Sequence, residues 1–191
     1  MKLKLGVVLI LMLIMISCDE ETYIPKPPTY LRLELPDHTY KYYVDSCQYS
    51  FDLASIYSIK KSPKSEDSEC HRRIDLGPLN GTVFFRYWDM TEPLSFYVNN
   101  ANDEIDRHKG KALNVRDELI LRDKDDVYGI LFQLEGDVAT PFQFYLTDST
   151  DRFVYGEVLF NFSPNYDSLK PTLDYLKQDL SQLLETFKWN Q

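Results

Sequence analysis

The sequence predicts an α+β protein in which an antiparallel sheet is covered by helices. Three observations lead to this prediction. Apolar and polar residues alternate in several short runs, three apolar segments follow one another closely in the second half, and leucines at helical spacing end the chain. Strands joined by short turns pair antiparallel, so the helices are left to cover the sheet.

The first 17 residues are predicted to be a signal peptide. Lys2 and Lys4 precede the apolar run Leu5–Ile16. This run of about twelve residues is far shorter than the roughly 20 that a membrane-spanning helix requires.

Cys18 is the predicted site of lipid attachment. The large residues Met15 and Ile16, followed by Ser17 and Cys18, resemble the bacterial lipobox. This resemblance implies a diacylglycerol on the Cys18 thiol, cleavage between Ser17 and Cys18, and an acyl chain such as palmitate on the new amino terminus. Several acyl chains, at about 0.8 kcal/mol per buried methylene, anchor a protein permanently. The alternative is an unmodified cysteine at the end of an apolar stretch.

The residues after the cleavage site leave the choice of membrane open. Asp19, Glu20 and Glu21 resemble a surface-export signal in Bacteroidota, whereas Asp19 alone resembles an inner-membrane retention signal in enterobacteria. We expect an anchor in the outer membrane with the domain facing the periplasm, and the inner membrane and the cell surface stay open.

The mature chain is acidic and is expected to form one globular domain. Cleavage removes Lys2 and Lys4 and leaves 19 basic residues against 30 acidic ones, a net charge of −11. This charge disfavours binding to nucleic acid and to anionic lipid. Residues 18–29 contain three prolines and predict a stiff tether, which leaves residues 30–191 for the domain.

Cys47 and Cys70 are predicted to form a disulfide, because an even pair remains in a compartment that permits oxidation. Closing this loop stabilises the fold by about 3 kcal/mol in the chain-entropy model. The alternative is a reactive thiol assisted by His71. It fits less well because adjacent residues of an extended chain point to opposite faces.

Several strands are expected in the first half of the domain. Tyr30–Leu35 alternates cleanly and ends at Pro36, Tyr40–Val44 forms a second run, and Tyr49–Ile59 holds one or two short strands. The turn pair Asn80-Gly81 precedes a further strand at residues 82–88, which places Val83, Phe85 and Tyr87 on one face.

A helix is expected next, with Thr91 as its cap, Pro93 in its first turn and Gly110 at its end. Its apolar stripe comprises Leu94, Tyr97, Val98, Ala101, Ile105 and His108. The following stretch, Leu113–Leu121, is compatible with either strand or helix.

The second half is expected to form an antiparallel meander after an acidic turn at Asp123–Asp126. Its strands are Val127–Leu134, Phe142–Leu146 and Phe153–Phe162, joined by turns at residues 136–141 and 148–151.

The C-terminal segment predicts one amphipathic helix, capped by Ser168 and with Pro171 in the first turn. Its stripe consists of Leu169, Leu173, Leu176, Leu180, Leu183 and Phe187. Packing against the core is favoured over a coiled-coil partner, because the heptads are too few. The order of elements loosely resembles the Mog1/PsbP-like sandwich.

The chain contains no GxSxG, HExxH, P-loop or GxGxxG pattern, and His38, His71 and His108 are scattered singly. We therefore expect no catalytic residue, no cofactor and no metal. An oxygen-rich cluster lacks the spacing of a calcium loop and is interpreted as a solvated helix face; it comprises Asn99, Asn100, Asn102, Asp103, Glu104 and Asp106. The acidic turn, with Asp123, Asp125 and Asp126 beside basic residues, is interpreted as solvent-exposed.

Ser149 and Ser168 are candidate O-glycosylation sites. Asp148-Ser149-Thr150 and Asp167-Ser168-Leu169 resemble the Bacteroidota acceptor, which is Asp, then Ser or Thr, then an aliphatic residue or Thr. The alternatives are a turn at Ser149 and a helix cap at Ser168, and both are favoured over glycosylation.

A long segment, Val127–Trp189, resembles the gliding motility lipoprotein GldD family of Bacteroidota; it reads VYGILFQLEGDVATPFQFYLTDSTDRFVYGEVLFNFSPNYDSLKPTLDYLKQDLSQLLETFKW. The likeness extends upstream through YIPKPPTYLRLELPDHTYKYY and CQYSF, within residues 23–51, and includes the lipobox. It is weakest over Glu92–Leu121.

This resemblance implies a non-catalytic component of the envelope machinery for gliding and type IX secretion, which acts as a scaffold among other envelope proteins. The matching positions expected to contact a partner are Thr140, Pro141, Gln143, Tyr145, Thr147 and Asp148. Turn formation and hydrogen bonding inside the sheet explain these positions equally well. The rival function is a binding module for a glycan or a secreted substrate, and an enzyme ranks third.

Overall fold

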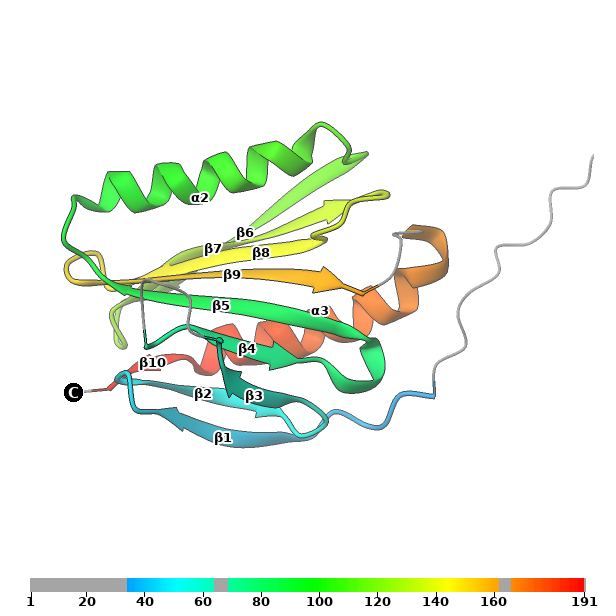
Figure 1. Cartoon of the computed structure of the whole chain (residues 1–191), viewed down its shortest axis with the longest axis horizontal. Coiled ribbons are helices and arrows are strands. Elements are labelled where there is room, and N and C mark those ends of the chain that lie inside the picture. The colour runs from blue at the N-terminus through cyan, green and yellow to red at the C-terminus, as the bar shows by residue number, and fades with distance from the viewer. Residues whose placement is uncertain (1–33, 64–68, 162–165, 191) are drawn as a thin grey trace, which may run out of the picture.

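The protein is built around a seven-stranded antiparallel sheet, shown by a computed structural model that describes residues 34–63, 69–161 and 166–190 (Figure 1). In spatial order its strands are β3 (Ser58–Lys61), β4 (Arg72–Asp75), β5 (Gly81–Asp89), β9 (Arg152–Phe160), β8 (Phe142–Thr147), β7 (Val127–Glu135) and β6 (Asn114–Arg122). A short 3₁₀ helix, η1 (Gly77–Leu79), joins β4 to β5.

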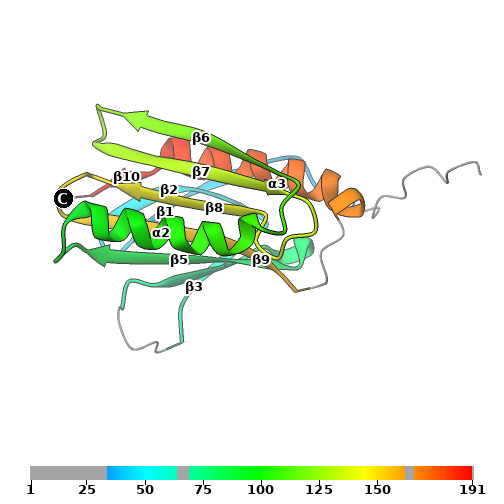
Figure 2. The same cartoon turned by 90° about the horizontal axis from the view of Figure 1, so that it is seen from above.

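A second, three-stranded sheet lies on one face of the large sheet. Its order is β1 (Tyr40–Asp45), β2 (Tyr49–Ala54) and β10 (Lys188–Trp189), and all its pairs are antiparallel. The helix α3 (Tyr166–Thr186) lies on the same side of the large sheet, whereas α2 (Leu94–Lys109) covers the opposite face (Figures 1 and 2). The predicted α+β architecture, an antiparallel sheet covered by helices, is confirmed.

The main core fills the space between the large sheet, the small sheet and α3. The predicted inward face of β5 is confirmed, because Val83, Phe85 and Tyr87 are at most 3% exposed. The predicted stripe of α3 is also buried there, and Phe187 follows directly after the helix and is fully buried. A smaller cluster between α2 and the other face contains Ala101 and Ile105 from the helix.

The meander is confirmed, since β7, β8 and β9 pair in sequence through antiparallel registers. The ambiguous stretch is a strand: β6 pairs with β7 over all nine residues, from Asn114 opposite Glu135 to Arg122 opposite Val127. Its two sides differ, because Val115 packs against the α2 cluster and Ile120 against the main core.

The strand expected at Tyr30–Leu35 is wrong over its described part. Residues 34–39 have no regular structure, and residues 30–33 lie outside the described residues. Leu35 still packs against the main core. Its burial therefore comes from side-chain contact alone, and the first described strand begins only at Tyr40, after Pro36.

Two expected helix starts are also wrong. Thr91 does not cap α2; the N-cap is Pro93, with no side-chain cap, and the Thr91 backbone N–H instead donates to the Tyr97 hydroxyl at 3.0 Å. α3 begins at Tyr166, so Ser168 and Pro171 lie inside the helix. The Tyr166 N–H donates to the Asp137 carboxylate at 2.9 Å, so a residue from a distant turn satisfies this helix end.

Candidate functional site

The predicted lipid site, Cys18, lies outside the described residues, as do the signal peptide and the tether at residues 18–29. Among the described residues, no helix is both long enough and apolar enough to span a bilayer. Cys18 lipidation therefore stays a prediction from the sequence.

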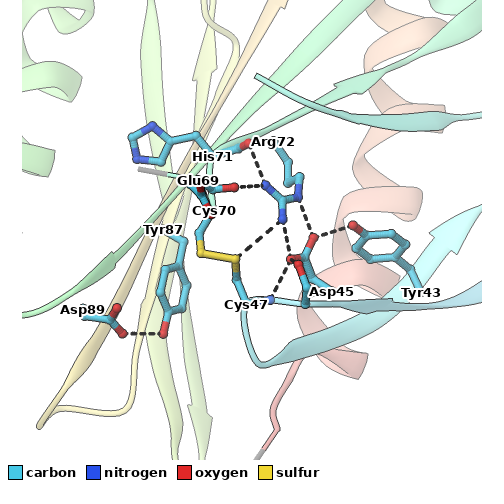
Figure 3. The surroundings of a disulfide bond; sticks show 10 residues. Tyr43, Asp45, Cys47, Glu69, Cys70, His71, Arg72, Tyr87 and Asp89 are labelled. Carbon is cyan, nitrogen blue, oxygen red and sulfur yellow. Dashed lines mark hydrogen bonds and ion pairs between the residues drawn. A yellow bond between two sulfur atoms is a disulfide. The ribbon is translucent and has the colours of Figure 1, made fainter. Parts of the chain in front are cut away.

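Cys47 and Cys70 form a disulfide, with Cα atoms 5.7 Å apart (Figure 3). Cys47 follows β1 and Cys70 precedes β4, so the bond joins the small sheet to the end of the large sheet formed by β3 and β4. Both sulfur atoms are used in this bond, which leaves neither as the thiol that His71 would assist.

A buried ion pair lies directly beside the disulfide. The Arg72 guanidinium donates to both carboxylate oxygens of Asp45 at 2.6 Å, and the Cys47 N–H donates to the same carboxylate at 2.9 Å (Figure 3). Tyr43 also donates its hydroxyl hydrogen to Asp45. The side chains of Asp45 and Arg72 are at most 3% exposed, so this group joins the two sheets without access to solvent.

The electrostatics of this cluster keep Asp45 charged. Burial acts to raise the pKa of Asp45, but the hydrogen bonds from Arg72, Tyr43 and the Cys47 N–H outweigh it, and the pKa lies below its usual value. Burial and the bond to Asp45 raise the pKa of Tyr43 to about 12, so Tyr43 remains a donor. The cluster is built to hold structure together and presents no reactive group to a substrate.

The side chains predicted to contact a partner lie mostly inside the protein. Thr140, Gln143, Tyr145 and Thr147 are at most 9% exposed, and Pro141 is buried as well. Gln143 donates to Thr140 at 2.9 Å and accepts from Tyr155 at 2.6 Å. Internal hydrogen bonding, the alternative considered from the sequence, therefore describes Thr140, Gln143 and Thr147, whereas Pro141 and Tyr145 are simply packed in the interior.

Asp148 is the sixth predicted contact position, and it organises the turn between β8 and β9. Its carboxylate accepts from the backbone N–H groups of Thr150, Asp151 and Arg152 at 2.8 to 3.0 Å. Burial acts to raise the pKa of Asp148, but these N–H bonds lower it below its usual value. Turn formation accounts for this residue.

The two candidate glycosylation serines occupy different surroundings. Ser149 is exposed in the same turn with a φ of +70°, and Ser168 is half-buried within the first turn of α3. Glycosylation of either residue stays a prediction, with Ser149 the more accessible of the two.

The acidic turn and the histidines that the sequence singled out do not gather into a metal site, whereas Asn100, Asp103 and Glu104 of the oxygen-rich helix face line one common pocket beside α2. In the acidic turn Asp125 lies 3.4 Å from Arg122 and 3.8 Å from Lys188. Among the described residues, no group of three or more His, Cys, Asp or Glu side chains could hold a metal ion. His38 does find a partner that its sequence position could not reveal, because its Nδ1 lies 2.7 Å from the buried Asp179 carboxylate.

The most distinctive exposed feature is the outer strand of the large sheet, β6. It is nine residues long, pairs on one side with β7, and leaves Leu119 and Leu121 each 63% exposed. Long, exposed, apolar edges are templates for pairing with another chain, and proteins usually blunt them. The charged residues Arg116, Asp117 and Glu118 blunt the first part of β6, which leaves Leu119–Leu121 as its apolar, unblunted segment. The opposite edge shows such blunting, since β3 has only four residues and carries Lys60 and Lys61.

A groove of about 210 Å³ adjoins this strand, between β6 and α3. Its apolar lining includes Ile120, Leu131 and Leu184, and Glu118 and Glu185 also line it. Leu119 and Leu121 point to the other face, because successive side chains of a strand alternate. We call β6, its two exposed leucines and this groove the β6 edge surface.

Comparison with known proteins shows a family and similarities to solved structures. A model of the family described as gliding motility lipoprotein GldD matches residues 20–189. No curated protein matches the chain. The solution structure of cyanobacterial PsbP (CyanoP) from Synechocystis sp. PCC 6803 is similar with 11% identity and a TM-score of 0.47, over 85% of this chain and 99% of that chain.

Proposed function

This chain belongs to the gliding motility lipoprotein GldD family, and from that premise we propose that it is a non-catalytic scaffold of the gliding and type IX secretion machinery. In this proposal, lipid on Cys18 holds the domain at a membrane of the cell envelope, in the expected case the outer membrane with the domain in the periplasm. Confinement to one membrane raises the effective concentration of partners held there.

The β6 edge surface carries this proposal. An extended segment of another envelope protein that pairs with β6 would add an eighth strand to the sheet. Its alternate side chains would then lie in the groove beside Ile120 and Leu131 on one face, and beside Leu119 and Leu121 on the other. The expected partner is therefore an extended segment with apolar side chains on both faces of the strand.

The contacts of residues 36–38, which follow the tether, are consistent with a domain that is held at a membrane through its N-terminal segment. The Tyr175 hydroxyl of α3 donates to the Pro36 carbonyl at 3.0 Å, and the rings of Tyr175 and His38 stack with centroids 4.0 Å apart. Asp179, one turn further along α3, binds His38. These contacts fix residues 36–38 against α3, so a pull on the lipid would reach the domain through this helix.

The test of the partner surface is Leu119→Glu combined with Leu121→Glu in the full lipoprotein, followed by crosslinking in native membranes and mass spectrometry. Both leucines are largely exposed, so the fold should tolerate the change. We expect the crosslinks formed by the wild-type protein to fall about tenfold, because two charges would have to be desolvated in the new interface. The matched control is Val44→Glu, a change at the exposed edge strand β1, where Val44 is 56% exposed.

Unchanged crosslinks in the Leu119→Glu, Leu121→Glu protein would reject the β6 edge surface as the partner site. An equal loss in the Val44→Glu protein would also reject it, because the effect would then not be specific to β6.

The anchor is tested separately by Cys18→Ser. We expect this variant to leave the membrane fraction and to lack the acyl mass that the wild-type amino terminus carries. A membrane fraction that does not change would refute lipidation of Cys18, whatever the outcome at β6.

A further inference from the structure

A second concave surface lies on the other face of the large sheet, between α2 and the strands β5 and β9. It encloses about 330 Å³, which is at the lower end of the range for small-ligand sites. We call it the α2 pocket. It shares no lining residue with the β6 edge surface.

Aromatic rings form one wall of the α2 pocket. Trp88 and Tyr97 both pack on the buried Phe153, with ring centroids 6.3 and 5.5 Å away, and Phe96 packs edge-on against Tyr97. The Tyr97 hydroxyl is also held by the Thr91 N–H. Trp88 and Tyr97 are therefore held in place before any ligand arrives, whereas Phe96 is 51% exposed and available for contact.

The polar side of the α2 pocket has no unbalanced positive charge. Arg86 is paired with Glu157 at 2.6 Å and Arg107 with Glu104 at 2.7 Å, although both guanidinium groups line the pocket. The Asp103 carboxylate and the Asn100 amide also line it and are exposed. The charge of each guanidinium is thus balanced by a glutamate, and the Asp103 carboxylate adds a negative charge, so this wall disfavours an anionic ligand. A ligand that donates hydroxyl hydrogens finds carboxylate and amide acceptors here.

From these two walls we propose that the α2 pocket binds a neutral sugar unit of an envelope glycan. A pyranose ring has an apolar C–H face, which is attracted to the negative face of an aromatic ring, and a rim of hydroxyl groups that donate and accept hydrogen bonds. The rings of Trp88 and Phe96 would contact the C–H face of the sugar, and Asn100 and Asp103 would bind its hydroxyl groups. A purely apolar ligand would form no hydrogen bond with the polar wall and would use only the aromatic one.

The test uses the full lipoprotein in a detergent without a sugar head group, and a panel of neutral, sulfated and amino oligosaccharides. Trp88 and Trp189 are the two tryptophans of the chain, so Trp189→Phe makes the fluorescence report on the α2 pocket. We expect neutral oligosaccharides to shift the Trp88 emission, and Phe96→Ala and Asp103→Asn each to weaken binding about tenfold. Both residues are exposed, and circular dichroism verifies folding.

The matched control is Tyr42→Ala, because Tyr42 is an aromatic residue of β1 in the small sheet that is 66% exposed and does not line the pocket. It should leave oligosaccharide binding unchanged. The proposal is overturned if no neutral oligosaccharide binds, if Phe96→Ala or Asp103→Asn has no effect, or if only charged sugars bind. The crosslinking results at β6 are independent of this outcome.

Discussion

At the scale of single residues, Asp45 is a buried charge whose carboxylate is held by several hydrogen bonds. Its side chain is 1% exposed and forms two hydrogen bonds with Arg72, whose side chain is 3% exposed. Removing one partner of such a pair costs more than the pair contributes, because the remaining charge stays buried without compensation.

The change Asp45→Asn is therefore expected to lower the free energy of unfolding by about 3 kcal/mol at pH 7. The folded pKa of Asp45 lies below its unfolded value of about 3.9, so its stabilising effect is complete above that value and is lost as the pH falls through the folded pKa. Urea unfolding at pH 7 and pH 3 should show the gap between wild type and variant shrinking. A gap of the same size at both pH values would contradict this account.

The burial of the predicted contact residues shows where residue patterns mislead. Polar Gln143 and Thr147 in β8 suggest an exposed face to a reader of the sequence. All six residues of β8 are buried, because this central strand is covered by α2 on one face and by the main core on the other. Only the internal bonds of Gln143 and Thr147 explain their burial, and no local signal announces those bonds.

At the scale of elements, glycine positions reveal how closely strands and side chains approach. A Cβ added at Gly156 in β9 would lie 2.1 Å from the Phe144 ring, which is fully buried in the main core. We expect Gly156→Ala to destabilise the protein by about 2 kcal/mol, since the ring must move within a packed core. The control is Gly110→Ala at the end of α2, where nothing lies within 4 Å. Equal urea midpoints for the two variants would show that the core adapts freely.

Arg122 links the outer strand to the end of α3. It donates to the Leu184 carbonyl at 3.1 Å and also to the Glu185 and Phe187 carbonyls. A cation and its donors at a helix C-terminus satisfy carbonyl groups that lack a partner in the helix. Arg122→Met should therefore cost about 1 to 2 kcal/mol in urea unfolding.

Arg116→Met, in the same strand, is the matched control for this prediction. Arg116 is paired with Glu135 at 3.0 Å, but its side chain is 65% exposed, so the change should cost less than about 0.5 kcal/mol. A similar loss in both variants would mean that Arg122 contributes no more than an ordinary surface charge.

Strong periodicity makes many elements predictable, whereas very short strands and contacts between distant residues cannot be predicted from local sequence. The alternation in β5 and the leucine stripe of α3 come from local sequence, and both predictions were right. The sequence does not predict β4, which has only four residues, most of them charged, or β10, which has only two, because segments this short carry no periodic signal. The partners Asp137 with Tyr166 and His38 with Asp179 join residues 29 and 141 positions apart, which no window along the chain can reveal.

At the scale of the whole molecule, the large sheet carries two separate surfaces, one proposed to bind a partner protein and the other a sugar. The β6 edge surface ends the sheet, whereas the α2 pocket lies between α2 and the strands β5 and β9. The small sheet carries neither surface. Its stability is therefore expected to matter for the fold, and the disulfide and the Arg72–Asp45 pair are its visible links to the strand β4.

Removing the disulfide tests whether the small sheet has a structural role only and takes no part in partner binding. Replacing Cys47 and Cys70 together by alanine releases a constraint between residues 23 positions apart, which should cost about 3 kcal/mol and lower the melting temperature by roughly 6 to 12 °C. We expect the variant to stay in the membrane and to keep its β6 crosslinks, because neither the anchor nor the edge strand involves these cysteines. Thermal unfolding by circular dichroism and crosslinking in membranes measure the two effects. Lost crosslinks in a variant that is still folded would mean that the cysteines act directly in function, and the purely structural role would then be wrong.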